Sequence, residues 1–279
     1  MIFSPSIDAV FGQTRMSIGE QLELVRAIGY NAFEMWGWWD KELDELERAK
    51  DRLELTLASM CTRMVSLVDP ACRSRYIAGL QESLTVARRL NCAHLISQTG
   101  NLLPGVSREA QRMSLIAGLK EAVPLLAQAG ITLLIEPLNT RIDHPGYYLE
   151  RSSEAFAIID EVDSPYVKLV FDMYHQQITE GNLIPAIVSH IDRIAYFHMA
   201  DHPGRHEAGT GEIHYPNVLE AIRGAGYDGY VGMEYFPLSD AKTSLMKMRS
   251  QFLHFEALTE EQQVRAVVSV HELFRKPNG

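Results

Sequence analysis

The sequence is poor in cysteine and in basic residues. Its 279 residues include three cysteines, Cys61, Cys72 and Cys92, which are scattered and form no CxxC pair. This argues against a disulfide framework, and we interpret the three thiols as small packing residues. Lys and Arg total 26 against 36 Asp and Glu, which gives a formal net charge of −10. Because nucleic-acid-binding proteins present a basic face, this charge balance argues against a nucleic-acid partner.

Long apolar runs, targeting segments and linkers are also missing. No apolar run approaches the roughly eighteen residues of a membrane helix. The N-terminus, MIFSPSIDAV, has no basic region ahead of its apolar residues, as a secretory signal would have. No Pro/Gly/Ser-rich linker or change of composition divides the chain. We therefore expect a cytoplasmic protein with no membrane partner, folded as one domain.

The chain consists of short apolar runs that alternate with amphipathic stretches. Eight runs have strand character, namely residues 2–7, 32–38, 55–61, 94–100, 132–138, 167–174, 193–200 and 230–236. Helical spacing of apolar residues is present at 17–29, 41–53, 75–90, 107–130 and 215–226. Gly29, Gly130 and Gly226 each stand just before a strand, where a left-handed cap would end the helix.

This alternation predicts a parallel sheet, whose strands are covered on both faces and are therefore apolar throughout. Eight strand–helix units in about 255 residues fit a closed (β/α)₈ TIM barrel better than a doubly wound sheet. We predict an α/β fold of one domain, with the barrel over residues 1–258. Residues 259–279 have the pattern of an extra C-terminal helix, which would extend the same domain and pack on the barrel or on another subunit.

Four consecutive predicted strands each end in a good metal ligand. These residues are Glu136, Asp172, His198 and Glu234. A TIM barrel holds its active site at this end of its strands. Taken singly, a glutamate here could pair with a neighbouring basic residue, and a histidine could be a core residue bonded to the backbone. Burying a carboxylate costs several kcal/mol unless it is compensated, so four converging ligands predict a shared divalent cation. Three oxygen donors and one imidazole favour Mn²⁺ or Mg²⁺, while Co²⁺ and Zn²⁺ also fit.

The segment RIAYFHMADHPGRHEAGTGEIHY, residues 193–215, follows a buried strand with many ionisable groups. We expect Arg205 to reach a polyoxygenated substrate. Glu207 and Glu212 are expected to shape the loop together with the glycines of GTG, which allow a tight backbone path. The loop histidines are expected to be structural or solvated rather than ligands; they are His202, His206 and His214.

Three tryptophans occur in the four residues WGWW within FEMWGWWD, which follows the second predicted strand. Trp36 is equally well interpreted as an apolar wall of a pocket or as ordinary packing. For Trp39 we favour ordinary packing. Phe236, in MEYFP after the eighth strand, is a candidate to close the pocket from the other side.

Several of these segments resemble the hydroxypyruvate isomerase family of the xylose-isomerase-like TIM-barrel superfamily. They are LLIEPLNTRIDHPGYYL, LVFDMYHQQITEGNL, MADHPGRHEAGTGEIHY and YDGYVGMEYFP, with SPSIDAVFGQ and GYNAFEMWGWW nearer the N-terminus. The resemblance spans nearly the whole chain and implies a TIM barrel. It also implies a homo-oligomer, a dimer or a tetramer, since relatives commonly associate.

The resemblance also implies roles for individual residues. Glu136, Asp172, His198 and Glu234 match the positions that hold one divalent metal in the superfamily, and the two glutamates match its acid/base pair. His175 and Arg205 match positions that contact substrate oxygens, and Trp36 and Glu207 are further candidates for substrate binding. One position differs, because hydroxypyruvate isomerases have Gln where this chain has His198, whereas ketose 3-epimerases have His.

The resemblance implies an isomerase of a small hydroxy-ketone or ketose, a polyhydroxylated carbonyl compound, which acts through an enediolate. The alternatives are a ketose 3-epimerase and an isomerase of the inosose or 2-oxo-tetronate type. A metal-dependent lyase or hydrolase on the same barrel is a further class, as is a non-catalytic sugar-binding protein. Endonuclease-type relatives use three metal ions and more histidine ligands, and the acidic charge balance counts against that class.

Overall fold

Short parallel strands alternate with helices in the computed structural model, which describes residues 1–256. The strands are β1 (Ile2–Pro5), β2 (Ala32–Phe33), β3 (Thr56–Leu57), β4 (Met60–Cys61), β5 (His94–Ser97), β6 (Thr132–Ile135), β7 (Val167–Asp172), β8 (Ile194–Met199) and β9 (Tyr230–Met233). The α-helices are α1 (Ile7–Val10), α2 (Ile18–Ile28), α3 (Leu43–Arg52), α4 (Arg73–Leu90), α5 (Arg108–Ala129), α6 (Ser152–Val162), α7 (Met173–Thr179), α8 (Leu183–Ser189), α9 (Tyr215–Gly224) and α10 (Ala241–Phe252). Short 3₁₀ turns are η1 (Pro70–Cys72), η2 (Ile191–Arg193) and η3 (Leu253–Phe255).

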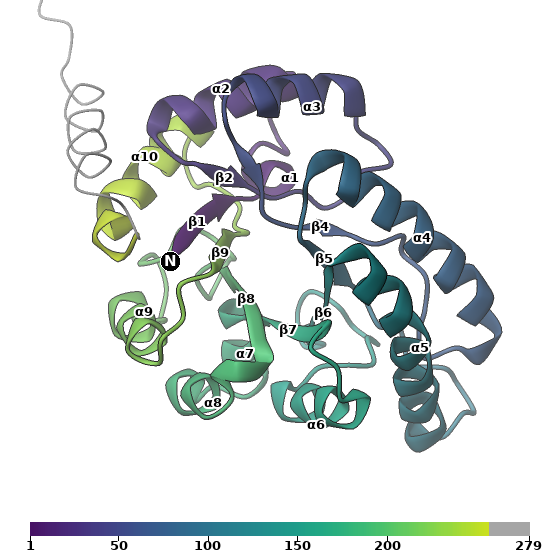
Figure 1. Ribbon diagram of the computed structural model, residues 1–279. Coiled ribbons are helices and arrows are strands. Elements are labelled where there is room, and N and C mark those ends of the chain that lie inside the picture. The colour runs from purple at the N-terminus through teal and green to yellow at the C-terminus, as the bar shows by residue number, and fades with distance from the viewer. Residues whose placement is uncertain (257–279) are drawn as a thin grey trace, which may run out of the picture.

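The strands form a ring that the helices surround, as Figure 1 shows in a view along the axis of the ring. Seven strands are paired in the order β1-β9-β8-β7-β6-β5-β4, and β2 pairs with β3. A parallel bridge between Ser6 and Glu34 joins the end of β1 to the end of β2. The ring is thereby closed, and the predicted TIM barrel is confirmed.

The third barrel strand is divided into β3 and β4. Between these two pieces the backbone still bonds to the second strand, because the N–H of Ala58 donates to the carbonyl of Phe33 at 2.8 Å. The N–H of Met35 donates in turn to the carbonyl of Ser59 at 3.2 Å. The eight predicted strand segments therefore correspond to the eight strands of the barrel, with β3 and β4 counted as one.

The core lies mostly between the strands and the helices, and a smaller apolar cluster is separate from it. The smaller cluster consists of Ala32, Ala58, Cys61, Ile96, Leu134, Val170 and Tyr196. In a β-strand, residues two apart point to the same face. Leu134, Val170 and Tyr196 are therefore followed on the same face by the residues two positions further along their strands. Those residues are Glu136, Asp172 and His198.

Helix ends follow the predicted signals. Ser17 and Glu20 form a capping box at the start of α2, and Gly29 ends that helix with a left-handed φ of 101°. Gly130 ends α5 in the same way, with φ 66°. Gly226 lies one residue beyond the cap of α9 and also has a positive φ, 86°. Only a residue without a Cβ adopts such angles at little cost, which is why glycine stands there.

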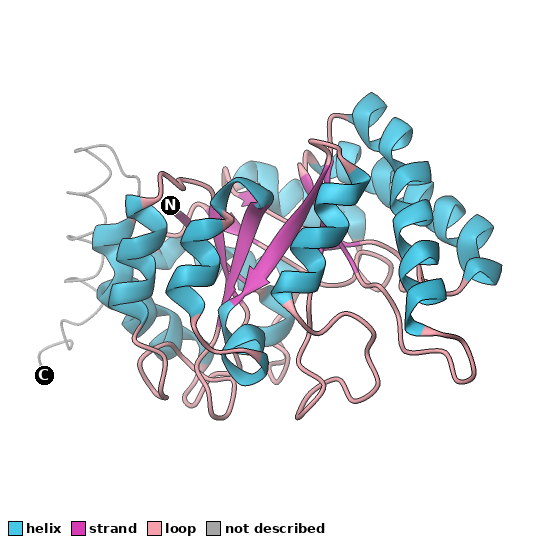
Figure 2. Cartoon of the chain, turned by 90° about the horizontal axis from the view of Figure 1, so that it is seen from below, coloured by secondary structure: helices cyan, strands magenta, loops and turns pink. Residues whose placement is uncertain are grey.

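Longer loops extend beyond the arrowheads of the strands in Figure 2, at the end of the barrel where the carboxyl ends lie. None of the helices within residues 1–256 is long and apolar enough to cross a membrane. The predicted C-terminal helical extension, residues 259–279, lies outside the described residues.

Candidate metal centre and active site

The four predicted metal ligands meet at the carboxyl end of the barrel. Asp172 is the last residue of β7 and His198 lies within β8, while Glu136 and Glu234 directly follow β6 and β9. All four side chains are buried, and one potential ligand atom from each lies within 4.8 Å of those of the other three. The structure therefore brings together side chains from four neighbouring strands, as the sequence predicted.

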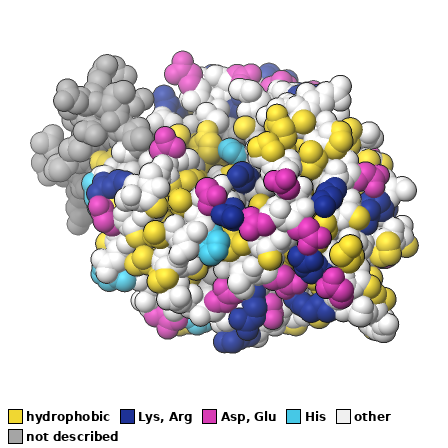
Figure 3. Space-filling model, turned by 60° about the horizontal axis from the view of Figure 1, so that its bottom comes forward, with side chains coloured by type: hydrophobic (Ala, Val, Ile, Leu, Met, Phe, Trp, Pro, Cys, Tyr) yellow, Lys and Arg dark blue, Asp and Glu magenta, His cyan; other side chains and the backbone are white. Residues whose placement is uncertain are grey.

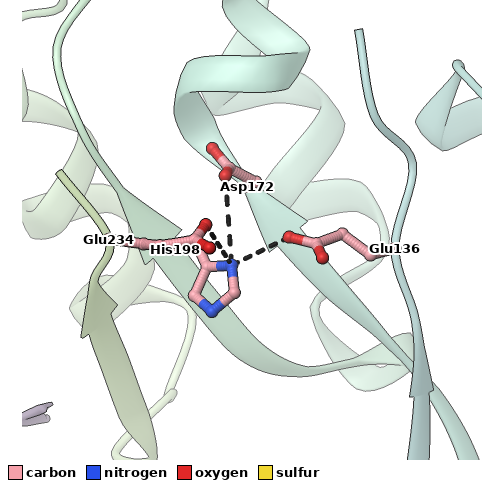
Figure 4. Close-up of side chains that lie close together, drawn as sticks. All are labelled: Glu136, Asp172, His198 and Glu234. Carbon is pink, nitrogen blue, oxygen red and sulfur yellow. Dashed lines mark hydrogen bonds and ion pairs between the residues drawn. The ribbon is translucent and has the colours of Figure 1, made fainter. Parts of the chain in front are cut away.

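His198 is at the centre of this cluster, and its ring nitrogen Nδ1 faces the three carboxylates (Figure 4). Nδ1 lies 2.8 Å from Glu136 Oε1, 3.3 Å from Glu234 Oε2 and 3.9 Å from Asp172 Oδ2. The two glutamates approach this nitrogen from opposite sides. Three carboxylate oxygens and one imidazole nitrogen around one point are a donor set that suits a divalent cation.

Asp172 presents one defined oxygen to the cluster. Its other oxygen, Oδ1, accepts the backbone N–H of Tyr174 at 2.7 Å and that of His175 at 3.1 Å, at the start of α7. These two bonds fix the carboxylate, so that Oδ2 is turned toward His198 and toward Arg205, whose Nη2 lies 3.9 Å away. A ligand held in this way needs little rearrangement when a cation binds.

The electrostatics of the cluster show that it requires positive charge. Burial raises the pKa of Glu136 to about 7, even though His198 opposes the shift. Burial would lower the pKa of His198, but the carboxylates of Glu34, Glu234 and Glu136 outweigh it and raise that pKa well above its ordinary value. Without a metal, a proton on His198 supplies the charge that a divalent cation would supply. The residues present therefore fit the cation.

Glu234 differs from Glu136 in its surroundings. Burial acts to raise the pKa of Glu234, but Arg205 and His198 overcome that effect and lower it. Arg205 Nη2 donates to Glu234 Oε2 at 2.6 Å, and the indole Nε1 of Trp36 donates to Oε1 at 2.6 Å. Both oxygens of Glu234 are thus held. Trp36 belongs to the pocket, which resolves the two interpretations left equal by the sequence.

His175 is oriented by Asn139, a residue that the sequence did not single out. The backbone N–H of Asn139 donates to His175 Nδ1 at 3.2 Å, and its side-chain amide lies 2.7 Å from the same atom. Nδ1 is therefore the acceptor, so the ring proton is on Nε2. Burial, followed by Arg205, lowers the pKa of His175 and keeps the ring neutral. Within the described chain Nε2 has no hydrogen-bond partner, and it lies 3.6 Å from Asp172 Oδ2.

Glu34 lies behind His198 and was not proposed as a site residue. Its side chain is buried, and Oε2 lies 3.4 Å from His198 Nε2 and accepts the hydroxyl of Tyr196 at 2.6 Å. Gly232 makes room for it, because a Cβ there would stand 2.1 Å from Glu34 Oε2. A carboxylate on the far nitrogen of a ligating histidine fixes the tautomer and the ring orientation. The sequence signal for it was a lone glutamate within the apolar run of residues 32–38.

The loop of residues 200–214 places Arg205 in the pocket. Asp201 accepts the backbone N–H of Gly209 at 2.7 Å and that of Ile213 at 3.1 Å, and it thereby ties the two sides of the loop together. Gly211 cannot carry a side chain, because a Cβ would stand 2.1 Å from the carbonyl oxygen of His202. The tight path expected for the GTG glycines is present.

Glu207 is buried in the same loop but does not line the cavity within the described chain. Its Oε1 accepts the hydroxyl of Ser244 at 2.6 Å, and its Oε2 accepts the backbone N–H of Leu238 at 3.2 Å. These bonds fit the expected shaping of the loop, and the expected contact of Glu207 with a substrate stays a prediction. Glu212, exposed on the loop, accepts a bond from Gln177 at 3.1 Å.

The loop histidines and the outer aromatic residues lie outside the cavity lining in the described structure. His206 Nδ1 bonds to the carbonyl of Phe236 at 2.7 Å, and the His214 side chain caps α9. Trp39 is half-exposed and packs edge-on against Trp38. Phe236 lies beside Arg205, whose guanidinium carbon is 5.8 Å from the ring centroid. Phe236 thus contacts a pocket residue without closing the pocket.

The cavity above the cluster has a volume of about 200 Å³. On the ligand side it is lined by Glu136, His175, His198, Arg205 and Glu234. The rest of its lining includes Glu34 and the neutral residues Trp36, Cys61, Ile96 and Gln98. Burial and the nearby carboxylates raise the pKa of Cys61 well above its ordinary value, so this thiol remains protonated and acts as packing.

Comparison with known proteins finds relatives that share the barrel fold. A family model described as Xylose isomerase-like TIM barrel matches residues 22–251. Hydroxypyruvate isomerase of Escherichia coli is 29% identical over 255 residues, which cover 88% of this chain and 97% of that protein. The 2-oxo-tetronate isomerase of Cupriavidus necator is 36% identical over 167 residues, 58% of this chain and 64% of that protein.

Among solved structures, the crystal structure of an AP endonuclease, family 2, from Brucella melitensis superimposes with a TM-score of 0.84. Its sequence identity is 26%, and the match covers 91% of this chain and 99% of that chain. The barrel, the convergence of four ligands at its carboxyl end and the match over most of the sequence lead to one conclusion. The chain belongs to the xylose isomerase-like TIM barrel family, and its relatives include hydroxypyruvate isomerase.

Proposed function

We propose that this protein is a metal-dependent isomerase of a small α-hydroxy ketone or ketose, of the hydroxypyruvate isomerase type. It would move a proton between adjacent carbons through an enediolate. The observation that carries the proposal is the position of Glu136 and Glu234 on opposite sides of a buried four-ligand cluster. Two positioned carboxylates can remove and return a proton beside a carbonyl.

Glu136, Asp172, His198 and Glu234 would hold one divalent metal ion, with Mn²⁺ or Mg²⁺ preferred and Co²⁺ or Zn²⁺ as alternatives. When bound, the metal supplies Lewis-acid stabilisation of the oxyanion that develops on the substrate.

The two glutamates would act as a pair. As a carboxylate, one of them would take the proton from the hydroxyl-bearing carbon, and the proton would return to the neighbouring carbon from a glutamate of the pair. The proton of the substrate hydroxyl would pass to the former carbonyl oxygen in the same conversion, so that no proton is gained or lost overall.

His175 and Arg205 would bind the oxygens of the substrate. The Nε2–H of His175 is buried and without a partner in the described chain, so it can donate to a substrate hydroxyl or carbonyl. Arg205 is already paired with Glu234, and its further donors can reach a substrate oxygen. Trp36 would orient Glu234 and form one wall of the pocket.

A ketose 3-epimerase is the second candidate. It is supported by His198, whose Nδ1 lies inside the cluster, at the position where the resemblance gives Gln to hydroxypyruvate isomerases. Epimerisation shares the first step, and the second glutamate returns the proton to the opposite face of the same carbon. Isomerases of the inosose or 2-oxo-tetronate type use the same step on other substrates, and a metal-dependent lyase would need bond cleavage in addition.

A nucleic-acid substrate is not supported. The group of four that could hold a metal in the described residues has a single histidine, whereas endonuclease-type relatives use three metal ions and more histidine ligands. Figure 3 shows Lys and Arg side chains next to Asp and Glu on one face, so that basic residues do not gather there into a patch.

Proton exchange in D₂O tests the proposal. Purified protein loaded with Mn²⁺ or Mg²⁺ would be incubated with hydroxypyruvate, tartronate semialdehyde, a tetrulose, a pentulose and a hexulose, and the products followed by NMR. We expect deuterium at the carbon beside the carbonyl of at least one compound, together with its isomer or epimer. A change in carbon number would indicate a lyase, and no exchange with any compound would contradict the proposal.

We also propose a homo-oligomer, a dimer or a tetramer, as expected from the resemblance. Its mass at micromolar concentration, measured by light scattering, would be a multiple of the 31.4 kDa of the chain. A mass equal to that of one chain would contradict this proposal.

A further inference from the structure

The side chain of Asp8, in α1, is bonded to both ends of the loop of residues 36–41, which follows β2. Its Oδ2 accepts the backbone N–H of Trp36 at 2.6 Å, and its Oδ1 accepts the ammonium group of Lys41 at 2.7 Å. The side chains of this ion pair are little exposed, at 18% for Asp8 and 14% for Lys41. A carboxylate that accepts two bonds in such a position holds both of its partners in place.

Asp8 reaches this loop because the ends of β1 and β2 lie side by side. The N–H of Ile7 donates to the carbonyl of Glu34 at 3.0 Å, so that α1 begins next to the end of β2. On the other side, the carbonyl of Trp36 accepts the N–H of Cys61, in β4, at 2.9 Å. The backbone of Trp36 is thus held between a side chain that follows β1 and the backbone of β4.

Trp36 in turn holds one oxygen of Glu234. Its indole Nε1 donates to Glu234 Oε1 at 2.6 Å, while Arg205 donates to Oε2 from the loop after β8. Trp36 and Glu234 line the metal pocket, and within the described chain Asp8 does not. The contacts therefore lead from Asp8 through Trp36 to Glu234.

We propose that Asp8 is a positioning residue for the reaction. Together with Lys41 it fixes the loop that carries Trp36, so that the indole N–H stays on Oε1 of Glu234. The orientation of Glu234 matters because a group that moves a proton must lie within hydrogen-bond reach of it, and a small displacement lowers the rate strongly. This inference rests on the proposed function, in which Glu234 belongs to the acid/base pair.

Variants at Asp8 and at its neighbour in the ion pair test this. Asp8→Ala removes both bonds to the loop, and Asp8→Asn keeps the volume but removes the charge, which provides a second test should the alanine variant not fold. Asp40→Ala and Asp40→Asn are the matched controls. Asp40 is an exposed carboxylate that binds the same Lys41, at 2.8 Å, without a hydrogen bond to Trp36 within the described chain.

NMR measures the position of the indole without turnover. The chain has three tryptophans, so ¹H–¹⁵N spectra should contain three indole signals, and the one that disappears in Trp36→Phe belongs to Trp36. An indole N–H that donates to a carboxylate resonates downfield of one that donates to water, because the bond is charge-assisted. With Mg²⁺ bound, we expect the Trp36 signal to move upfield in both Asp8 variants and to stay in place in both Asp40 variants.

The kinetic effect is expected in kcat, measured by deuterium exchange with a compound that the wild-type protein converts. Asp8→Ala should lower kcat about three- to tenfold, as expected for the loss of one hydrogen bond, and Asp8→Asn about two- to fivefold. KM should stay within about twofold in both, because Asp8 does not line the pocket. The Asp40 variants should keep the wild-type values of kcat and KM.

The role of Asp8 is overturned if the Trp36 signal stays at its wild-type position in the Asp8 variants, or if it moves while kcat is unchanged. Equal changes in the Asp40 variants, or a lower melting temperature as the one effect at Asp8, would also overturn it. In each of these cases the wild-type protein would still exchange protons, so the proposed function would stand. If the wild-type protein exchanges no compound, the proposed function fails and the role of Asp8 in turnover fails with it.

Discussion

The two halves of the barrel differ sharply in the charge they bring to its carboxyl end. Strands β6 to β9 provide Glu136, Asp172, His198 and Glu234, all buried. Strands β1 to β5 line the same cavity largely with neutral residues such as Ile96 and Gln98. Ionisable ligand residues are thus concentrated on one half of the barrel, while the other half presents mainly uncharged side chains to the same cavity.

Glu34 is the exception on the neutral half. It follows β2, yet its carboxylate is bonded to Tyr196 and lies 3.4 Å from His198, both residues of β8. Its charge therefore acts on the charged half of the site. Buried carboxylates are tolerated where a partner or cation compensates them, which explains why they gather on one side.

Removal of the metal should have the largest effect on activity. We expect about one divalent ion per chain in the purified protein, and complete loss of exchange activity after chelation, because the charged half without a cation cannot stabilise an enediolate. Readdition of Mn²⁺ or Mg²⁺ should restore it. Elemental analysis and the exchange assay provide the measurements.

Asp172→Asn and His198→Ala should lose the metal, whereas Asp160→Asn, an exposed carboxylate paired with Arg193 outside the site, should keep it. Full activity in a metal-free protein would contradict the prediction.

The next effect in size concerns the two glutamates. Glu136→Gln and Glu234→Gln should each lower turnover by about 10²- to 10⁴-fold or more, since each removes a positioned acid or base and a metal ligand. The melting temperature should change little, because the amide has the volume of the carboxyl group.

NMR exchange in D₂O separates the two roles. One variant should still exchange the proton on one face of the substrate while forming no product, because it retains the other carboxylate. Wild-type rates of turnover and exchange in both variants would show that the acid/base assignment is wrong.

A smaller effect is expected for Glu34, which follows β2 but lies next to His198 of β8. Glu34→Gln should weaken metal binding about 10- to 100-fold, because the carboxylate next to His198 Nε2 no longer fixes the ring. Isothermal titration with Mn²⁺ measures this without depending on turnover.

Glu256→Gln is a matched control, since Glu256 is a little-exposed glutamate that pairs with Arg249 outside the cavity. Equal metal affinity in the wild-type protein and Glu34→Gln would refute the role given to Glu34.

The smallest effect is the pH dependence of stability. In the metal-free protein the pKa of Glu136 is raised from 4.5 to about 7, and that of His198 is raised well above 6.5. At these two groups the folded state binds more protons than the unfolded state, so their contribution to stability falls as the pH rises from about 4.5 through about 7 for Glu136, and above 6.5 for His198. The lowered pKa of His175 acts in the opposite direction, and its contribution rises with pH below 6.5. Metal binding requires deprotonated ligands, so the stabilisation by metal grows over the same interval.

Melting temperatures measured with and without Mn²⁺ from about pH 5 to about pH 8 test this, because that range covers most of the interval in which these groups titrate. The melting temperature with Mn²⁺ should exceed that without Mn²⁺ by more as the pH rises. A difference that is constant across the range would show that these groups do not titrate with metal binding.

Much of the fold was predictable because it depends on local pattern. The run predicted as the seventh strand, residues 193–200, contains β8 (Ile194–Met199) and exceeds it by one residue at each end. The second strand is shorter than its apolar run, since β2 ends at Phe33 and Glu34 bridges to Ser6. Apolar pattern reports burial and not hydrogen-bond register, so it could not show where this strand ends or that the third strand is divided.

The site was predictable in its ligands and less so in what surrounds them. Four ligand residues at the ends of successive strands were visible in the sequence, since parallel strands in a barrel bring these ends together. Glu207 was expected to contact the substrate and to shape its loop; the structure shows the bonds to Ser244 and Leu238 that shape the loop, and the contact with a substrate stays a prediction. The direction of a side chain on a loop depends on partners far along the chain, and no local pattern reports it.

The alternation of strands and helices, the barrel and the four residues that would hold a metal could be predicted from local pattern alone. Three features could be known only from the folded chain: the orientation of His198 with Nδ1 toward the carboxylates, the neutral state of His175 and the bond of Trp36 to Glu234. The position of Glu34 belongs with them, because it contacts His198 and also Tyr196, which is 162 positions further along the chain. Periodicity acts over a few residues, whereas these contacts join strands that meet only when the barrel closes.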